Sequence, residues 1–133
     1  MSLTMQSIVE QDASATSARA SIVAMFSAID ACEWPRLPEY FHDEIVYLRP
    51  GYEPIRGLAD LLDFYAHRRI IRSGKHIIET TCVSGNGNTL SATGSFSGVD
   101  RSGKTVRVRF CDVYVFQSGK IRWRETFFNS PAV

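Results

Sequence analysis

The sequence lacks the features that define several large classes of protein. No apolar run approaches the roughly 20 residues that a membrane-spanning helix needs, and the first residues carry neither the basic segment nor the apolar core of a secretion signal. The net charge is only +1, from 15 Lys and Arg against 14 Asp and Glu, so no charge excess draws the chain to polyanions. We therefore expect no membrane and no nucleic acid among its partners.

Sequence motifs for cofactors, metals and covalent catalysis are also missing. No Gly-x-Gly-x-x-Gly fingerprint of a dinucleotide site occurs, and no Gly-x-Ser-x-Gly sequence indicates a nucleophilic serine. The three cysteines, Cys32, Cys82 and Cys111, lie far apart and match no zinc-binding spacing. We expect no cofactor and no metal. The odd number of cysteines without a secretion signal indicates reduced thiols and a cytoplasmic protein.

What is present is a helical half followed by a half rich in strands. Residues 14–32 place apolar side chains at the 3.6-residue period of a helix, and residues 58–72 show a similar apolar face. A short helix is expected from Pro35 to Phe41, and residues 45–49 are expected to form a strand. After Gly74, turn sequences rich in Gly, Asn and Ser separate four further predicted strands, at residues 75–84, 88–98, 104–117 and 120–129.

This order of elements predicts an α+β protein in which helices pack on one face of a curved antiparallel sheet. We expect a single domain over residues 14–133, preceded by a flexible segment at residues 1–13. A chain of 133 residues is long enough for one sizeable core and too short for two.

Asp112 is the one charged residue on an otherwise apolar strand face. The even positions of residues 106–116 are Val, Val, Phe, Asp, Tyr and Phe, and alternate residues of a strand share a face. Burying a carboxylate costs several kcal/mol unless it is protonated, hydrogen-bonded or paired. Asp112 is therefore interpreted either as an acid or base in an apolar pocket or as a structural carboxylate held by an arginine.

The partner of Asp112 depends on the turn at residues 117–120. A two-residue turn places Asp112 opposite Glu125 and points Ile121 and Trp123 inward. A three-residue turn with a glycine bulge places it opposite Arg124 and turns Ile121 and Trp123 outward. The sequence alone leaves both registers open.

The second register exposes an apolar patch around Val113, Val115 and Trp123 on the outer face of the sheet. Because monomeric proteins rarely expose such patches, this register predicts a homodimer.

The remaining candidates are one histidine and one arginine. His76 begins a strand and is the natural proton carrier near neutral pH, whereas His42 and His67 lie in polar surroundings and are expected to be solvated. Arg69 lies on the apolar face of the third predicted helix and is expected to reach a pocket, while Arg68 and Arg72 suit the negative end of the helix dipole.

Three segments carry a resemblance to known proteins: Leu37-Pro-Glu-Tyr-Phe-His-Asp-Glu-Ile-Val-Tyr47, Gly57-Leu-Ala-Asp-Leu-Leu-Asp-Phe-Tyr65 and Phe110-Cys-Asp-Val-Tyr-Val-Phe-Gln-Ser-Gly-Lys-Ile121. With the order of elements, they resemble the nuclear-transport-factor-2-like superfamily, and within it the SnoaL-like polyketide cyclases and ketosteroid isomerases. The resemblance implies a cone-shaped, cystatin-like roll, in which a curved antiparallel sheet wraps around a long N-terminal helix and encloses an apolar pocket.

The resemblance also bears on individual residues. Asp112 matches the acidic residue that looks like the general acid/base of the cyclases, and Arg124 is expected to face the pocket beside it. The ketosteroid isomerase base falls at Leu48, which cannot take a proton, and the first helix lacks that family's donor tyrosine. Residues 90–98 contain no charge, unlike the corresponding strand of limonene epoxide hydrolases.

Taken together, these observations predict a pocket that binds a small apolar molecule, in which an isomerase or cyclase reaction begins with proton abstraction next to a carbonyl. The alternative is a non-catalytic small-molecule-binding or dimerisation module of the same fold. The predicted catalytic residues are Asp112 and His76, and the predicted ligand-binding residues are Tyr47, Tyr65, Arg69, Phe110, Tyr114 and Arg124.

Overall fold

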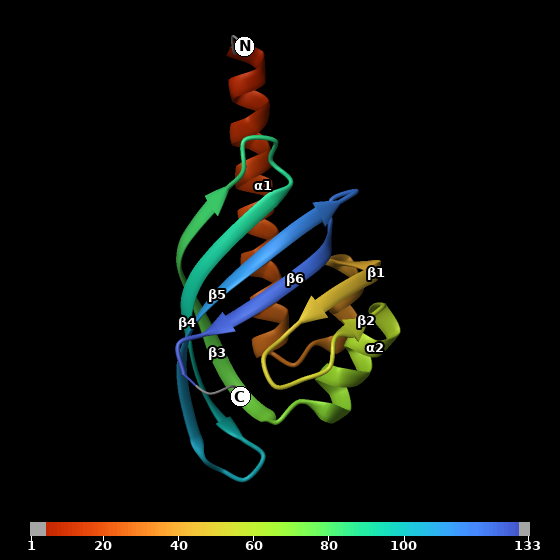
Figure 1. The fold of residues 1–133 in the computed structure, drawn as a ribbon, viewed down its shortest axis with the longest axis vertical. Coiled ribbons are helices and arrows are strands. Elements are labelled where there is room, and N and C mark those ends of the chain that lie inside the picture. The colour runs from red at the N-terminus through yellow and green to blue at the C-terminus, as the bar shows by residue number, and fades with distance from the viewer. Residues whose placement is uncertain (1–4, 131–133) are drawn as a thin grey trace.

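A long helix and a curved six-stranded sheet make up most of the computed structural model, which describes residues 5–130 and their side chains from residue 16 on (Figure 1). The strands curve around the C-terminal half of α1 (Met5–Asp30), and the sheet order is β2-β1-β6-β5-β4-β3. The strands are β1 (Phe41–Leu48), β2 (Ile55–Arg56), β3 (Ile71–Val83), β4 (Thr89–Asp100), β5 (Thr105–Gln117) and β6 (Lys120–Phe128). The predicted α+β class with helices against a curved sheet is confirmed.

Helix α1 packs through the apolar stripe that predicted it. Ala18, Ile22, Met25 and Ile29 are all buried and repeat at the spacing of one helix face. After Asp30 the chain turns at Cys32, whose φ of 56° is left-handed, and the N–H of Glu33 donates to the carbonyl of Ala28. This Schellman-type ending satisfies a free carbonyl and fixes the last turn of the helix against β3.

The start of α1 differs from the prediction. The helix begins at Met5 and not near residue 14. Residues 1–4 of the predicted flexible segment lie outside the described residues, and the flexibility of that segment stays a prediction.

The predicted third helix is shorter and less regular than the pattern indicated. It consists of α2 (Leu58–Asp63) and one π-helical turn, η2 (Phe64–Arg68), and Arg69 is already extended with ψ 132°. The expectation that Arg72 ends this helix is therefore wrong. Ile70 and Ile71 are β-branched residues that favour a strand, and Ile71 is buried at the start of β3.

The first strands also differ from the prediction, in their bounds and in their number. The short helix predicted from Pro35 is a 3-10 helix, η1 (Trp34–Glu39), and β1 begins directly after it. Strand β2 was not predicted; it pairs with β1, which in turn runs parallel to β6. The four predicted strands after Gly74 are found close to their expected bounds.

The β5–β6 hairpin follows neither predicted register. Ser118 and Gly119 have φ values of 54° and 77° and form a two-residue turn, so Phe116 pairs with Ile121. A bulge at Arg122 then shifts the pairing so that Val115 pairs with Trp123. The extra residue lets Ile121 point inward and turns Trp123 outward, a combination that neither register predicted.

Beyond this bulge, the inward face of β6 carries polar side chains that meet Asp112. Thr126 lies directly opposite Asp112, and Arg124 lies opposite Tyr114, one diagonal step away on the same face. Glu125 is opposite Val113 and faces outward, so the two carboxylates do not share a site.

Gly94 allows the strands and the Phe110 ring to pack closely on the inner face of the sheet. A Cβ on Gly94 would lie 2.2 Å from the carbonyl oxygen of Ile77 and 2.8 Å from Cζ of Phe110. The missing side chain therefore leaves room for the Phe110 ring to lie flat across β4.

The β4–β5 hairpin contains a sequence that resembles a phosphate-binding loop. Residues 98–105 fit the pattern Gly-x-x-x-x-Gly-Lys-Thr. In the structure these residues end β4, form a tight turn and begin β5. No helix follows the turn, so the segment lacks the helix N-terminus on which such a loop depends.

Candidate active site

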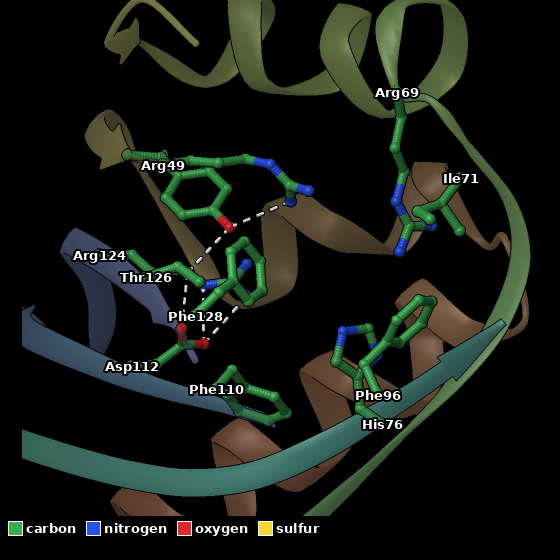
Figure 2. A pocket seen from close by; sticks show the side chains of 11 residues that line it. Arg49, Arg69, Ile71, His76, Phe96, Phe110, Asp112, Arg124, Thr126 and Phe128 are labelled. Carbon is green, nitrogen blue, oxygen red and sulfur yellow. Dashed lines mark hydrogen bonds and ion pairs between the residues drawn. The ribbon is translucent and has the colours of Figure 1, made fainter. Parts of the chain in front are cut away.

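A cavity opens between the concave face of the sheet and the segment that follows η2 (Figure 2). Its walls stand close together, so the enclosed volume is only about 20 Å³, within about 330 Å³ of space that includes open solvent. The lining side chains are Tyr47, Arg49, Arg69, Ile71, His76, Phe96, Phe110, Asp112, Arg124, Thr126 and Phe128. The mixture of rings and a few converging polar groups is typical of a small-molecule site.

Asp112 is completely buried and accepts four hydrogen bonds. The hydroxyls of Tyr114 and Thr126 each donate at 2.5 Å, to Oδ2 and Oδ1 respectively. Arg124 donates to Oδ2 from Nε at 3.2 Å and from Nη2 at 3.0 Å. An ionised carboxylate only accepts hydrogen bonds, so four surrounding donors match its charged form.

A series of hydrogen bonds connects Asp112 to Arg49 through Thr126 and Tyr47. Because Thr126 donates to Asp112, the hydroxyl of Tyr47 donates to Thr126, at 3.0 Å. Arg49 donates to the Tyr47 hydroxyl at 3.5 Å. Every donor in this series of hydrogen bonds therefore points toward the carboxylate, and the dashed lines in Figure 2 mark the bonds themselves.

Arg124 is the cation that compensates Asp112. Its guanidinium also donates to the Tyr65 hydroxyl at 2.9 Å and stacks over the Tyr47 ring, with Cζ 4.4 Å from the ring centroid. Burial lowers the pKa of Arg124, but the attraction of Asp112 together with that of three surrounding tyrosines, Tyr47, Tyr65 and Tyr114, outweighs it and holds that pKa well above its usual value. Burial likewise raises the pKa of the Tyr114 phenol, which therefore stays protonated as a hydrogen-bond donor.

His76 faces the cavity from β3 and is held by Asp30 at the end of α1. Its Nδ1 lies 2.6 Å from Asp30 Oδ1, and its backbone N–H donates to Asp30 Oδ2 at 2.9 Å. A neutral imidazole in this arrangement donates from Nδ1, which leaves the Nε2 lone pair as an acceptor. Within the described part of the chain, Nε2 has no hydrogen-bond partner.

Aromatic rings enclose the imidazole. The His76 ring stacks on Phe26 with a centroid distance of 4.3 Å, and the rings of Phe96 and Phe110 lie 4.7 and 5.7 Å away. Burial lowers the pKa of His76, and the hydrogen bond to Asp30 offsets this only in part. His76 is therefore neutral at neutral pH, the form that accepts a proton.

The structure brings most of the predicted site residues to this one cavity. Asp112, His76, Tyr47, Arg69, Phe110 and Arg124 line it. Tyr65 and Tyr114 lie behind the lining and hold Arg124 and Asp112.

Two functional candidates were missed in the sequence. Asp30 follows the buried residues Ile22 and Phe26 at four-residue spacing, so it lies on the same helix face. A single carboxylate on an apolar helix face could have been recognised in the sequence as a candidate. Thr126 gave no signal, because its direction depends on the bulge at Arg122.

The described residues give little support for a metal site, a disulfide or a membrane-spanning helix. They contain no cluster of three or more His, Cys, Asp or Glu side chains that could hold a metal ion. Cys32, Cys82 and Cys111 are free thiols. Of the helices that are described, none is long and apolar enough to cross a membrane.

A long helix in the concave face of a curved six-stranded sheet is a fold that this chain shares with a solved NTF2-like protein. A family model described as SnoaL-like domain matches residues 22–124, and the chain belongs to this SnoaL-like family. No curated protein sequence matches the chain.

Solved structures repeat the fold at low sequence identity. A SnoaL-like polyketide cyclase from Agrobacterium tumefaciens str. C58 is 16% identical with a TM-score of 0.71, over 85% of this chain and 91% of that one. An LEH-like epoxide hydrolase from M. tuberculosis is 16% identical with a TM-score of 0.75, over 86% and 80%. An NTF2-like protein of unknown function from Burkholderia pseudomallei K96243 is 14% identical with a TM-score of 0.76, over 85% and 91%. These similarities establish the fold, which hosts several chemistries.

Proposed function

We propose that this chain is an acid–base enzyme that acts on a small carbonyl compound in the cavity, with His76 as the base. The observation that carries the proposal is the Asp30–His76 pair, which presents an oriented, neutral imidazole to a cavity lined by aromatic rings and a few polar groups. A histidine fixed by a carboxylate is the usual arrangement for a proton-transferring base. The similarity to a SnoaL-like polyketide cyclase supports the same class of reaction.

In the proposed step, Nε2 of His76 removes a proton from the carbon next to the carbonyl. The electron pair of the broken C–H bond moves toward the carbonyl oxygen and forms an enolate. Asp30 stabilises the resulting imidazolium through Nδ1. The imidazolium then returns the proton at the far carbon of a conjugated enolate, so that the C=C bond shifts, which gives an isomerisation. Alternatively, the enolate carbon attacks a second carbonyl carbon of the same molecule. The π pair of that C=O bond moves to its oxygen, which takes the proton from the imidazolium, and this gives a cyclisation.

Arg124 is the proposed partner of the enolate oxygen. Its bonds to Asp112 and Tyr65 use three of its five N–H groups, which leaves two donors for the oxygen. These donors are fixed before the substrate arrives, and fixed donors stabilise developing negative charge most effectively.

Asp112 is proposed as a positioning residue that holds Arg124. The four donors around its carboxylate favour this role over direct proton transfer. Proton transfer by Asp112 itself, as the sequence suggested, stays an untested prediction.

The second candidate function is a non-catalytic small-molecule-binding module. It is favoured by the narrowness of the cavity and by the complete hydrogen bonding of its only lining carboxylate, Asp112. In that case His76 would only help to bind the ligand.

The test measures deuterium incorporation next to the carbonyl of a panel of cyclic ketones and 1,3-diketones in D2O. Wild-type protein is expected to accelerate exchange, and His76→Gln to lose about 100-fold or more of that acceleration, the usual contribution of a positioned base. His67→Gln, at an exposed histidine of η2, is the matched control and is expected to behave as wild type. Equal rates in His76→Gln and wild type would contradict the proposal, and no exchange of any ketone would favour the binding module.

Asp30 offers a second test of the same dyad. Because Asp30 raises the pKa of His76, Asp30→Asn is expected to move the acid limb of the pH–rate profile to lower pH. A purely structural loss would lower the rate at every pH without moving the limb.

We also propose that two copies associate through the outer face of β5 and β6. Val113, Val115 and Trp123 are only partly buried there, and Phe127 is half exposed. A dimeric mass by light scattering at micromolar concentration is expected, and a monomeric mass would exclude it. The cytoplasmic location predicted from the cysteines stays a prediction.

A further inference from the structure

Arg69 is a buried cation that has no anionic partner among the side chains that the structure describes. Its residue surface is only 5% exposed, and Nε is buried without a hydrogen-bond partner. Within residues 16–130, its guanidinium makes neither an ion pair nor a hydrogen bond. Its contacts are with two aromatic rings, Tyr65 and Phe96, whose centroids lie 5.5 and 6.0 Å from Cζ.

The backbone at Arg69 is fixed in a way that aims this side chain into the cavity. The N–H of Arg69 donates to the carbonyl of Phe64 at 2.8 Å and closes the π-helical turn, a feature frequent at functional sites. The carbonyl of Arg69 accepts from Nε of Arg101 at 2.7 Å. Figure 2 shows the guanidinium extending from the helix end toward His76 and Phe96.

An unpaired buried charge is costly, and proteins rarely retain one without compensation. Burial lowers the pKa of Arg69, a sign of how poorly the site solvates the cation. Arg124 in the same cavity shows the usual solution, since Asp112 compensates it. The missing counter-ion of Arg69 is therefore expected from outside the chain.

We propose that Arg69 binds a carboxylate of the ligand, so that the substrate is a small, mostly planar carbonyl compound that carries an acid group. The guanidinium is a planar fork that matches the two oxygens of a carboxylate. The rings of Phe96 and Phe110 receive the apolar part of such a molecule, and His76 lies beside them. This inference rests on the proposed function in requiring that the cavity binds a small molecule, and it replaces the purely apolar ligand expected from the sequence.

The experiment compares benzoate with benzamide, which share a ring and differ in charge. The affinity of the full chain for each is measured at equal ionic strength by following the imidazole NMR signals of His76. Benzoate is expected to bind about tenfold or more tightly than benzamide, the advantage of a charge-assisted hydrogen bond. Arg69→Met is expected to bind both probes equally, and Arg69→Lys to keep part of the preference.

Arg72→Met is the matched control, since Arg72 is exposed on β3 three positions along the chain. It is expected to keep the full preference for benzoate. A preference that persists in Arg69→Met would overturn the inference. Equal affinities in wild type would overturn it and leave the proposed function standing, because the cavity would still bind both probes. No change of the His76 signals with either probe would overturn both.

Discussion

Two arginines in the same cavity differ in how their charge is compensated. Arg124 is almost completely buried and has Asp112 at 3.0 Å, itself surrounded by three further hydrogen bonds. Arg69 is as deeply buried, and its guanidinium lies over the rings of Tyr65 and Phe96 with no ion pair among the described residues. The charge of Arg124 is balanced by the protein itself and needs no anion from a ligand. The charge of Arg69 is not balanced in this way, and the difference indicates which of the two arginines would bind an anionic group.

The largest expected effect comes from breaking the complete pair. Arg124→Met leaves Asp112 buried with only two hydroxyl donors, so we expect a loss of about 3–5 kcal/mol in the free energy of unfolding. Urea denaturation measures this loss. Glu79→Ala, which breaks an exposed ion pair with Arg109, is the control and is expected to change little. Equal losses in the two variants would contradict a special role for the buried pair.

A smaller effect is expected from removing one donor of the same cluster. Thr126→Val keeps the shape of the side chain and removes the hydrogen bond to Asp112. A bond to a charged acceptor contributes about 1.5–3 kcal/mol, and a loss of that size is expected in urea denaturation. An unchanged stability would mean that Asp112 does not need this donor.

The mostly buried His76 side chain is expected to make the free energy of unfolding depend on pH. Burial lowers the pKa of His76 in the folded protein, so the unfolded chain binds more protons once the pH falls below its ordinary value of about 6.5. The free energy of unfolding is therefore expected to decrease on acidification through this range, by up to about 1.4 kcal/mol per pH unit. His76→Gln should remove this part of the slope, and an identical slope would contradict the lowered pKa.

The smallest expected effect comes from the unpaired arginine. Arg69→Met removes a cation that no side chain compensates, so its stability is expected to stay within about 1 kcal/mol of wild type or to rise. Comparison with Arg124→Met by the same denaturation experiment sharpens the contrast between the two arginines. A loss as large as that of Arg124→Met would show that Arg69 also has a structural role.

Much of the fold was predictable because it follows local patterns. The helical period of residues 14–32 and the alternation of residues 106–116 gave the correct elements and the correct inward face for Asp112. The turn sequences located the last four strands. Short or irregular elements, such as β2 and the π-helical turn at Phe64–Arg68, leave no periodic pattern and were missed.

The candidate site was only partly predictable, because its key contacts join distant segments. Asp30 and His76 are separated by 46 positions, and no local pattern relates them. The Asp112–Arg124 pair was expected from the family resemblance, but the turn alone did not predict it, because the structure reaches it through a two-residue turn and a bulge at Arg122.

The sequence by itself determined the element types and the face of the strand on which Asp112 lies, since side-chain direction in helices and strands follows from backbone geometry alone. The tertiary structure decided which groups meet. It brought Asp30 to His76, directed Arg124 to Asp112 through the bulge, and left Arg69 without an anion. These contacts depend on how the sheet curves around α1. The curvature results from the twist and packing of all the strands together, so no single segment of the sequence determines it.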